Sequence, residues 1–339
     1  MAKLYILIRT LPAVLLLMVS TLSWADYDFM IQLTLALILA TLAILGVSYG
    51  IVHWGLSHSA YNEKDTYSYM YSEYPYLKQW VRRLNANEQL CETTLLTPDS
   101  LYLHAYYIPA DRPTPNTAIV IHGHKNSAVG MLHIAYMYSH NLHFNVLLPD
   151  LRAHGHSEGD HIGMGWQDRN DIQLWIREAP RLFSQSEPRI VVHGISMGAA
   201  TTMMLAGDRT PDNVLCFVED CGYTSVWEAF SYIADHRFHI PKFPFMYLAN
   251  VISKWKYGFS FKEASSVNQL KKAEKPMLFI HGTNDHYVPT EMVHTLYMAK
   301  PCNKSIWEAP NSRHTRSYHD YPKEYTSHVA AFVNSYFYK

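Results

Sequence analysis

A serine stands between two glycines in the stretch Gly194-Ile195-Ser196-Met197-Gly198. The apolar run RIVVH precedes this stretch and the helix-forming run AATTMMLA follows it, so the pattern predicts a strand that turns at once into a helix. Such a tight turn leaves no room for side chains two residues before and after the serine, which accounts for both glycines. The turn would hold the Ser196 hydroxyl at the positive end of the helix, where it can act as a nucleophile.

A serine nucleophile needs a base and an acid that orients the base. In chain order after Ser196, Asp285 follows the apolar run PMLFIH, and His314 lies in the loop after the run KSIWEA. We expect Asp285 to be the acid, with Asp220 as the alternative, and His314 to be the base, with His319 as the alternative. The predicted reaction is acyl transfer to water through an acyl-enzyme, with no cofactor and no metal.

The negative oxygen formed during such a reaction needs hydrogen-bond donors. The backbone N–H of Met197 is the first expected donor, and the backbone N–H of His124, after the run TAIVI, is the second. His122 and His124 also form an H-x-H pair that is typical of metal sites, but no third ligand follows at a suitable spacing, so no metal is expected there.

These residues are predicted to follow the strands of an alternating α/β pattern. Strands are predicted at residues 92–97, 101–108, 117–121, 145–149, 189–193, 214–219, 276–281 and 304–309. Helices are predicted at about 127–140, 166–183, 197–206, 289–299 and 322–338. Several strands are continuous apolar runs, as expected for strands covered on both faces, so the pattern predicts a mostly parallel, doubly wound sheet with helices on both sides.

Residues 225–268 interrupt this alternation with two helical stretches joined by a proline-containing turn. An insertion at the carboxyl edge of such a sheet tends to overhang the site, so we expect a helical cap. Its aromatic residues predict an apolar acyl pocket. The alternative is a packing subdomain that does not contact the substrate.

The N-terminus carries two apolar segments. Residues 29–52 contain no charge and are long enough to cross the roughly 30 Å hydrocarbon layer as a transmembrane helix. The run at 10–24 fits a signal peptide, the first span of a hairpin or a segment that does not cross. These alternatives place the rest of the chain on different sides of the membrane, and the sequence leaves the side open.

Composition narrows the possible classes of protein further. The net charge is −1 with histidines neutral, so no basic field is present to bind nucleic acid. The four cysteines show no metal-type spacing. The predicted division of the chain is a signal-like or first membrane segment (1–28), a transmembrane helix (29–52), a linker (53–90) and a catalytic domain (91–339).

Several separated blocks resemble the α/β-hydrolase superfamily, and more narrowly bacterial membrane-anchored α/β hydrolases of the serine-aminopeptidase-like group. The blocks are IVIHGH (119–124), NVLLPDLRAHGHSEGDHIGMGWQDRNDI (145–172), VHGISMGAATTMM (192–204), VEDCGYTSVWEAFSY (218–232), FKEASSVNQLKKAEKPMLFIHGTNDHYVP (261–289) and the C-terminal YPKEY. The resemblance implies an α/β-hydrolase fold with a helical cap and a catalytic role for Ser196, Asp285 and His314. It also implies that the turn at 150–157 (D-x-R-x-x-G-x-S) is scaffold.

Two departures from this group stand out. Arg313 precedes His314 where the group usually has glycine, and the apolar run at 10–24 is additional to the one anchoring helix that members commonly carry. The sequence therefore predicts a membrane-anchored serine hydrolase that cleaves carboxylic esters or small amides. The alternatives are a serine peptidase or acyltransferase on the same triad, or a hydrolase-fold binding module with little turnover.

Overall fold

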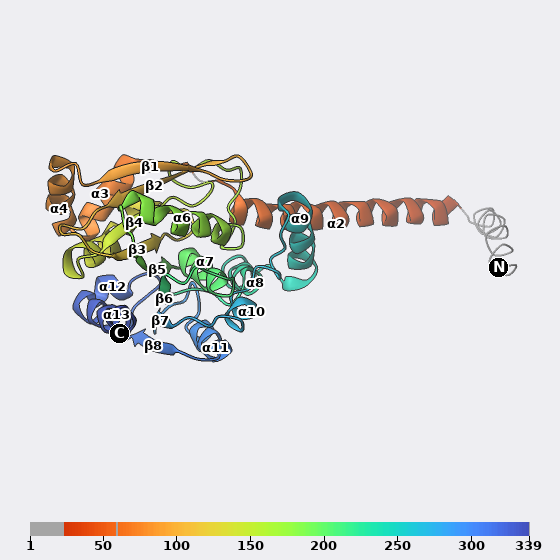
Figure 1. Ribbon diagram of the computed structural model, residues 1–339. Helices are drawn as coiled ribbons and strands as arrows, with labels where there is room; N and C mark the ends of the chain where they lie inside the picture. The colour runs from red at the N-terminus through yellow and green to blue at the C-terminus, as the bar shows by residue number, and fades with distance from the viewer. Residues whose placement is uncertain (1–23, 59, 339) are drawn as a thin grey trace, which may run out of the picture. The chain divides into compact units, whose positions relative to one another are not determined.

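The computed structural model describes residues 24–58 and 60–338, and the chain divides into two units, Met1–Gly50 and Ile51–Lys339 (Figure 1). Helix α2 (Trp24–Leu56) begins in the first unit and ends in the second. It contains the whole of the predicted transmembrane segment. The apolar run predicted at 10–24 lies, except for its last residue, outside the described residues.

The second unit is built on one eight-stranded sheet with the strand order β1-β2-β4-β3-β5-β6-β7-β8. The strands are β1 (Cys91–Leu96), β2 (Tyr102–Ile108), β3 (Asn116–Ile121), β4 (Asn145–Pro149), β5 (Arg189–Ile195), β6 (Val214–Asp220), β7 (Met277–Gly282) and β8 (Lys304–Ala309). The pairs from β4 to β8 are parallel, whereas β2 pairs antiparallel with both β1 and β4. The predicted mostly parallel sheet and its eight strands are confirmed.

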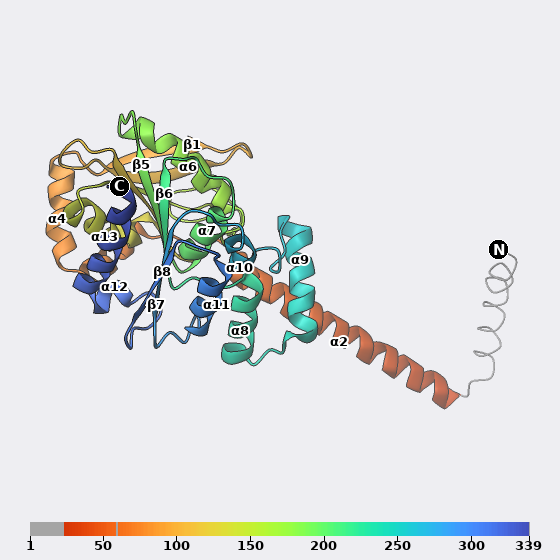
Figure 2. The ribbon, with the colours of Figure 1, turned by 60° about the horizontal axis from the view of Figure 1, so that its bottom comes forward.

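Helices cover both faces of this sheet (Figures 1 and 2). The helices of the second unit are α3 (Glu63–Glu73), α4 (Tyr76–Ala86), α5 (Leu132–Tyr136), α6 (Asp168–Leu182), α7 (Met197–Ala206), α8 (Val226–Phe238), α9 (Tyr247–Tyr257), α10 (Ser266–Leu270), α11 (Glu291–Ala299), α12 (Ser317–Asp320) and α13 (Pro322–Phe337). Three short turns complete the set: η1 (Ala128–Met131), η2 (Met137–Asn141) and η3 (Lys242–Met246).

Alternate residues along the central strands enter two separate cores. In β3, Ile119 and Ile121 pack with residues of α6, α7 and α11, whereas Ala118 and Val120 pack with residues of α4, α5 and α13. The residues of β3 are all buried because both faces of the strand are covered. This arrangement is the doubly wound sheet that the continuous apolar runs predicted.

Two segments differ from the sequence expectation in detail. The helix expected at about 127–140 consists of three consecutive short pieces, η1, α5 and η2. In the stretch predicted as a linker, residues 53–90, α4 coincides with the short helix expected near 76–85, whereas α3 was not expected. Leu77 of α4 is fully buried in the core. The tyrosines and apolar residues of α3 recur at helical spacing and can share one face of the helix. The stretch packs as part of the second unit.

The insertion at 225–268 forms α8, η3 and α9. Ser225 caps α8, because its hydroxyl accepts a hydrogen bond from the N–H of Glu228. The helices bury one face, and residues of α8 and α9, such as Phe230 and Ala249, join the core on the α7 side of the sheet. The two predicted helical stretches are therefore present.

Candidate active site

The turn from β5 into α7 has the strained geometry that its glycines require. Ser196 has φ 57° and ψ −114°, a left-handed conformation that is costly for a residue with a side chain. A Cβ on Gly194 would lie 2.0 Å from the carbonyl oxygen of Gly198, and a Cβ on Gly198 would lie 2.2 Å from that of Ile121. The Ser196 N–H donates to the carbonyl of Asp220 at 2.8 Å, which joins the turn to the end of β6.

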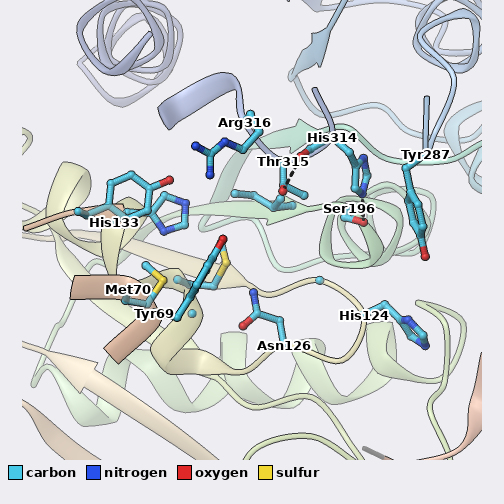
Figure 3. A pocket seen from close by; sticks show the side chains of 15 residues that line it. Tyr69, Met70, His124, Asn126, His133, Ser196, Tyr287, His314, Thr315 and Arg316 are labelled. Atoms are coloured by element: carbon cyan, nitrogen blue, oxygen red, sulfur yellow. Dashed lines mark hydrogen bonds between the residues drawn. The ribbon is translucent and has the colours of Figure 1, made fainter. Parts of the chain in front are cut away.

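Three side chains predicted from separate parts of the sequence meet at this turn, and Figure 3 shows two of them, Ser196 and His314. Ser196 Oγ lies 2.9 Å from His314 Nε2, and His314 Nδ1 lies 2.7 Å from Asp285 Oδ2. Since the carboxylate accepts, His314 carries its proton on Nδ1 and leaves Nε2 free to accept from the serine hydroxyl. This is the order of bonds in which a histidine can act as a base toward a serine.

The acid of this arrangement is held in its ionised form. Burial by itself would raise the pKa of Asp285, but hydrogen bonds from His281 and His314 outweigh it and keep the pKa well below its usual range. The N–H groups of Tyr287 and Val288 each donate to Oδ1 at 2.9 Å. Asp285 therefore faces four donors and remains a carboxylate.

The alternative residues for the acid and the base lie elsewhere. Asp220 accepts a hydrogen bond from the Tyr325 hydroxyl at 3.0 Å, and burial raises its pKa to about 6. His319 Nδ1 lies 2.9 Å from Asp320, and its ring contacts Tyr74. Among the described residues, neither side chain forms a hydrogen bond to the Ser196 hydroxyl or to the His314 ring.

The arginine in front of His314 replaces a glycine of the related enzymes without strain. Positive φ angles in this loop fall at Asn311 and Thr315, and not at Arg313. The Arg313 side chain is exposed and lines a depression with Asn284 on the other side of His314, whose ring lines both this depression and the cavity at Ser196. No left-handed backbone is needed at this position, so a large residue fits there.

The loop after β3 approaches the serine closely. Gly123 has no Cβ, and one placed there would lie 3.3 Å from Ser196 Cβ. The carbonyl of Gly123 accepts from His122 Nδ1 at 2.8 Å and from the N–H of Asn126 at 3.2 Å. Because a trans peptide points its N–H opposite to its carbonyl, these two bonds also fix the direction of the His124 N–H.

Two amide groups near the serine remain unused by the fold. Within the described residues, the hydrogen bonds of turns and loops include no acceptor for the N–H of Met197 or of His124. Met197 is the first residue of α7, where the helix dipole favours negative charge. Both N–H groups therefore lack an acceptor among the loop and turn hydrogen bonds of the described residues, as an oxyanion donor requires, and their role stays a prediction.

Ring nitrogens of the H-x-H pair, His122 and His124, form hydrogen bonds within the protein. His122 Nε2 accepts the N–H of Leu151 at 3.0 Å, so both of its ring nitrogens are engaged. His124 Nε2 donates to the carbonyl of Gly55 at 2.9 Å, and burial lowers its pKa to about 4. The two histidines hold loops together in their neutral form.

Cys221 lies near Asp285 and His314, with the three potential ligand atoms within 4.8 Å of one another. A cysteine must be a thiolate to bind a metal. Burial raises the pKa of Cys221 well above its usual value, so the thiol stays protonated, and His314 and Asp285 already bind each other. The donor set suits a hydrogen-bonded triad better than a metal ion.

A cavity of about 410 Å³ opens at Ser196 and His314 (Figure 3). Its wall opposite the serine comes from α3 and the residue that follows it. The other lining residues come from the end of β5, from η1 and α5, and from the loops after β3, β7 and β8. The lining side chains that sequence reasoning missed are Tyr69, Met70, Tyr74, Asn126, Met131, His133, Tyr287, Thr315 and Arg316. No residue of 225–268 lines this cavity, so the aromatic residues of that insertion do not form its acyl pocket.

Side-chain contacts attach α3 to the loop that carries His314. Arg316 forms an ion pair with Glu73, and this bond lowers the pKa of Glu73. Tyr74 stacks on His133 with ring centroids 4.8 Å apart and an interplanar angle of 7°. A sequence signal for α3 existed, because Tyr67, Met70 and Tyr74 recur at intervals of three and four residues.

The fold and the chemistry of this site define a serine hydrolase of the α/β-hydrolase superfamily. Residues 153–339, more than half of the chain, match the model of the prolyl oligopeptidase family. The chain belongs to this family.

Among similar proteins, the uncharacterized protein YqkD of Bacillus subtilis is 30% identical over 251 residues, which cover 73% of this chain and 81% of YqkD. The uncharacterized protein YfhR of Escherichia coli K12 is 25% identical over 229 residues, 66% of this chain and 72% of YfhR.

Solved structures share the fold at lower identity. The Pyrococcus furiosus esterase Pf2001 superposes with a TM-score of 0.59 and 23% identity, covering 73% of this chain and 92% of the esterase. Est1E of Butyrivibrio proteoclasticus, solved with ferulic acid, superposes with a TM-score of 0.56 and 18% identity, covering 73% of this chain and 100% of Est1E. The Pyrococcus horikoshii acylaminoacyl peptidase superposes with a TM-score of 0.53 and 17% identity, covering 73% of this chain and 41% of the peptidase.

Proposed function

We propose that the protein is a membrane-anchored serine hydrolase that cleaves carboxylic esters or small amides, with Ser196 as nucleophile, His314 as base and Asp285 as acid. The observation that carries this proposal is the continuous line of hydrogen bonds from Ser196 Oγ through His314 to Asp285. The N–H groups of Met197 and His124 are the proposed oxyanion donors.

The proposed reaction has two steps. Ser196 Oγ forms a bond to the acyl carbon while its proton passes to His314 Nε2, and the carbonyl oxygen becomes negative between the two amides. His314 then gives the proton to the leaving alcohol or amine as its bond to the acyl carbon breaks. In the second step His314 takes a proton from water as the water oxygen bonds to the acyl carbon. The bond between the acyl carbon and Ser196 Oγ then breaks, and His314 returns the proton to Oγ, which releases the carboxylic acid and restores the serine.

The size and lining of the cavity support a small substrate. A cavity of about 410 Å³ falls in the range of sites that enclose small molecules. Its lining includes the apolar side chains of Ile195, Met131 and Met70 and the rings of three tyrosines. An acyl group of modest size fits these properties better than a folded protein does.

Helix α2 supports the membrane anchor. Asp26–Leu56 is one helix, long and apolar enough to cross a membrane, and 11% of its most apolar stretch is buried in the protein. A core helix would be mostly buried, whereas large apolar side chains such as Phe29 and Leu39 are exposed here. A signal sequence has the same properties, so extraction of membranes at alkaline pH tests the anchor: an anchored full-length chain stays in the pellet.

A peptidase is the second candidate, because the chain belongs to the prolyl oligopeptidase family. The full-length protein should be assayed on matched p-nitrophenyl esters and p-nitroanilides with the same acyl groups. Faster turnover of the esters at equal acyl group supports the esterase. Turnover of peptidyl anilides that equals or exceeds that of the esters supports the peptidase.

A fluorophosphonate probe tests the nucleophile and the base directly. We expect labelling of the full-length protein and of Ser186→Ala, an exposed loop serine that serves as the control. Ser196→Ala and His314→Ala should lose labelling, whereas His319→Ala should keep it. No labelling of the folded natural protein, or labelling that survives in Ser196→Ala, contradicts the proposal.

A further inference from the structure

Helix α9 is apolar on two opposite faces. Its inner face buries Ala249 and Ser253. Tyr247, Val251 and Trp255 follow one another at four-residue intervals, so they share one face, and all three are exposed. Phe243, just before the helix, is 76% exposed, and its ring contacts Tyr247 with centroids 5.9 Å apart. We call Phe243, Tyr247, Val251 and Trp255 the α9 ridge.

A ridge of this kind is unusual on a surface that faces only water. Trp255 is 85% exposed, although large aromatic side chains gain free energy when they leave water. Single exposed apolar residues are common, but a contiguous row of four along one helix marks an interaction surface. The side chains contribute little to the fold in these positions, so folding alone does not account for their size.

The charges around the ridge are mainly positive. Residues 226–263 contain five lysines and arginines against three acidic residues, in a chain whose net charge is −1. Lys242 precedes Phe243, and Lys254 and Lys256 flank Trp255. Lys242 forms an ion pair with Glu228 at 3.3 Å and Lys254 forms one with Glu263 at 2.9 Å, and both lysine side chains remain about half exposed. Segments that lie at the interface of a bilayer typically combine tryptophan and phenylalanine with lysine. Their aromatic rings enter the interface and their ammonium groups reach lipid phosphates.

The insertion that carries the ridge also contacts the segment through which the chain enters the second unit (Figure 2). Trp54, in the last turn of α2, makes edge contacts with Phe230 and Phe238 of α8, at centroid distances of 6.0 and 5.9 Å. Phe238 is itself half exposed. The apolar surface of α8 and α9 is therefore connected by direct packing to the end of the helix proposed to span the membrane.

We propose that the α9 ridge binds the surface of the lipid bilayer and gives the second unit a second contact with the membrane. This inference rests on the proposed anchoring by α2. The anchor would keep the ridge at a high effective concentration near the lipid, so that a contact too weak to recruit a free protein suffices here. The contact would hold the second unit in one orientation on the membrane.

The test uses full-length protein reconstituted in vesicles of phosphatidylcholine and phosphatidylglycerol, with Cys91→Ser and Cys302→Ser as the background. A nitrobenzoxadiazole label is placed at Leu39→Cys in α2, at Trp255→Cys in the ridge or at Tyr338→Cys. Tyr338 is the matched control, because it is an exposed apolar side chain near the C-terminus, at the other end of the second unit from α9. Lipids with a doxyl quencher on the acyl chain then report contact with the bilayer.

We expect quenching at least twofold stronger at residues 39 and 255 than at 338. Quenching at 39 with a water-like signal at 255 overturns the ridge proposal and leaves the anchor intact. Quenching at 255 without quenching at 39 contradicts the anchor instead. A blue-shifted emission at 255 that doxyl lipids do not quench indicates a protein partner, and equal quenching at 255 and 338 indicates non-specific adsorption, so either result overturns the proposal.

Discussion

The two sides of the cavity are held in place by different kinds of interaction. On one side, Ser196, Asp285 and His314 follow the carboxyl ends of β5, β7 and β8, and the backbone bonds of a buried parallel sheet position them. On the other side, α3 is attached by side chains, including the Arg316–Glu73 ion pair and the stacking of Tyr74 on His133. The comparison suggests that the sheet edge determines the chemistry and the α3 wall determines which acyl group fits.

The largest effect should come from the acid at the sheet edge. Asp285→Asn can no longer hold the Nδ1–H tautomer of His314, so we expect kcat/KM to fall by about 10⁴. Asp220→Asn, which removes a buried carboxyl of the neighbouring strand, should lower kcat/KM less than tenfold. Steady-state kinetics on one p-nitrophenyl ester compares the two variants. The reverse order would make Asp220 the acid.

A second way to break the sheet edge is to fill the space between β3 and α7. A Cβ on Gly198 would lie 2.2 Å from a carbonyl oxygen of the sheet, so Gly198→Ala should lower the free energy of unfolding by about 3 kcal/mol. Gly258→Ala is the control, because Gly258 has φ +80° but open space around it, and it should cost about 1 kcal/mol. Urea unfolding followed by circular dichroism measures both values. Equal losses would show that close packing at Gly198 does not matter.

The contact between the wall and the body of the protein should depend on pH. Burial lowers the pKa of His133 to about 3, whereas a histidine in an unfolded chain titrates near 6.5. The unfolded state therefore takes up the proton first, and the stability that neutral His133 provides is present above about pH 6.5 and is lost as the pH falls toward 3. His133→Phe keeps a ring against Tyr74 but cannot bind a proton.

Between pH 7 and pH 5, the variant His133→Phe should lose about 2 kcal/mol less free energy of unfolding than the natural protein. His328 stacks on Trp307 at the surface, so His328→Phe replaces a stacked histidine that is already solvated. The control should follow the pH dependence of the natural protein. Parallel curves for His133→Phe and the natural protein would show that His133 is not the titrating group.

The smallest effect should come from the exposed part of the wall. Tyr69→Ala opens the cavity on the α3 side, and we expect KM for a bulky acyl ester to change by about tenfold while kcat for a small one stays constant. Tyr102→Ala, an equally exposed tyrosine outside the cavity, should change neither. An acyl-chain series on both variants makes the comparison. A large fall in kcat for Tyr69→Ala with small esters would show that the wall also takes part in the chemistry.

The sequence predicted the sheet edge well because its signals are local. Each strand of the sheet is a short apolar run, and each predicted catalytic residue follows such a run, so a parallel sheet must bring them to one edge. The sequence also predicted the strained turn at Ser196, because only glycine fits at positions 194 and 198.

The wall could not be predicted in the same way. Helix α3 alternates tyrosines with serines and acidic residues, so its apolar face is weak, and its place beside the His314 loop depends on contacts between residues more than 240 positions apart, such as Glu73 and Arg316. The insertion at 225–268 misled the expectation because its aromatic residues pack against the core or lie at the surface of α8 and α9, and none of them lines the cavity. The amino-acid composition of the insertion does not show which of these positions an aromatic residue takes.

The end of α2 has a practical consequence for producing a soluble form of the enzyme. Val52 and Leu56 are fully buried in the core, and the carbonyl of Gly55 accepts the hydrogen bond from His124, which lines the cavity together with Ser196. A shortened chain that starts at residue 60 loses these contacts and frees the loop that carries the proposed oxyanion donor. A shortened chain that starts near residue 50 keeps them, so the expression boundary belongs inside the apolar helix and not after it.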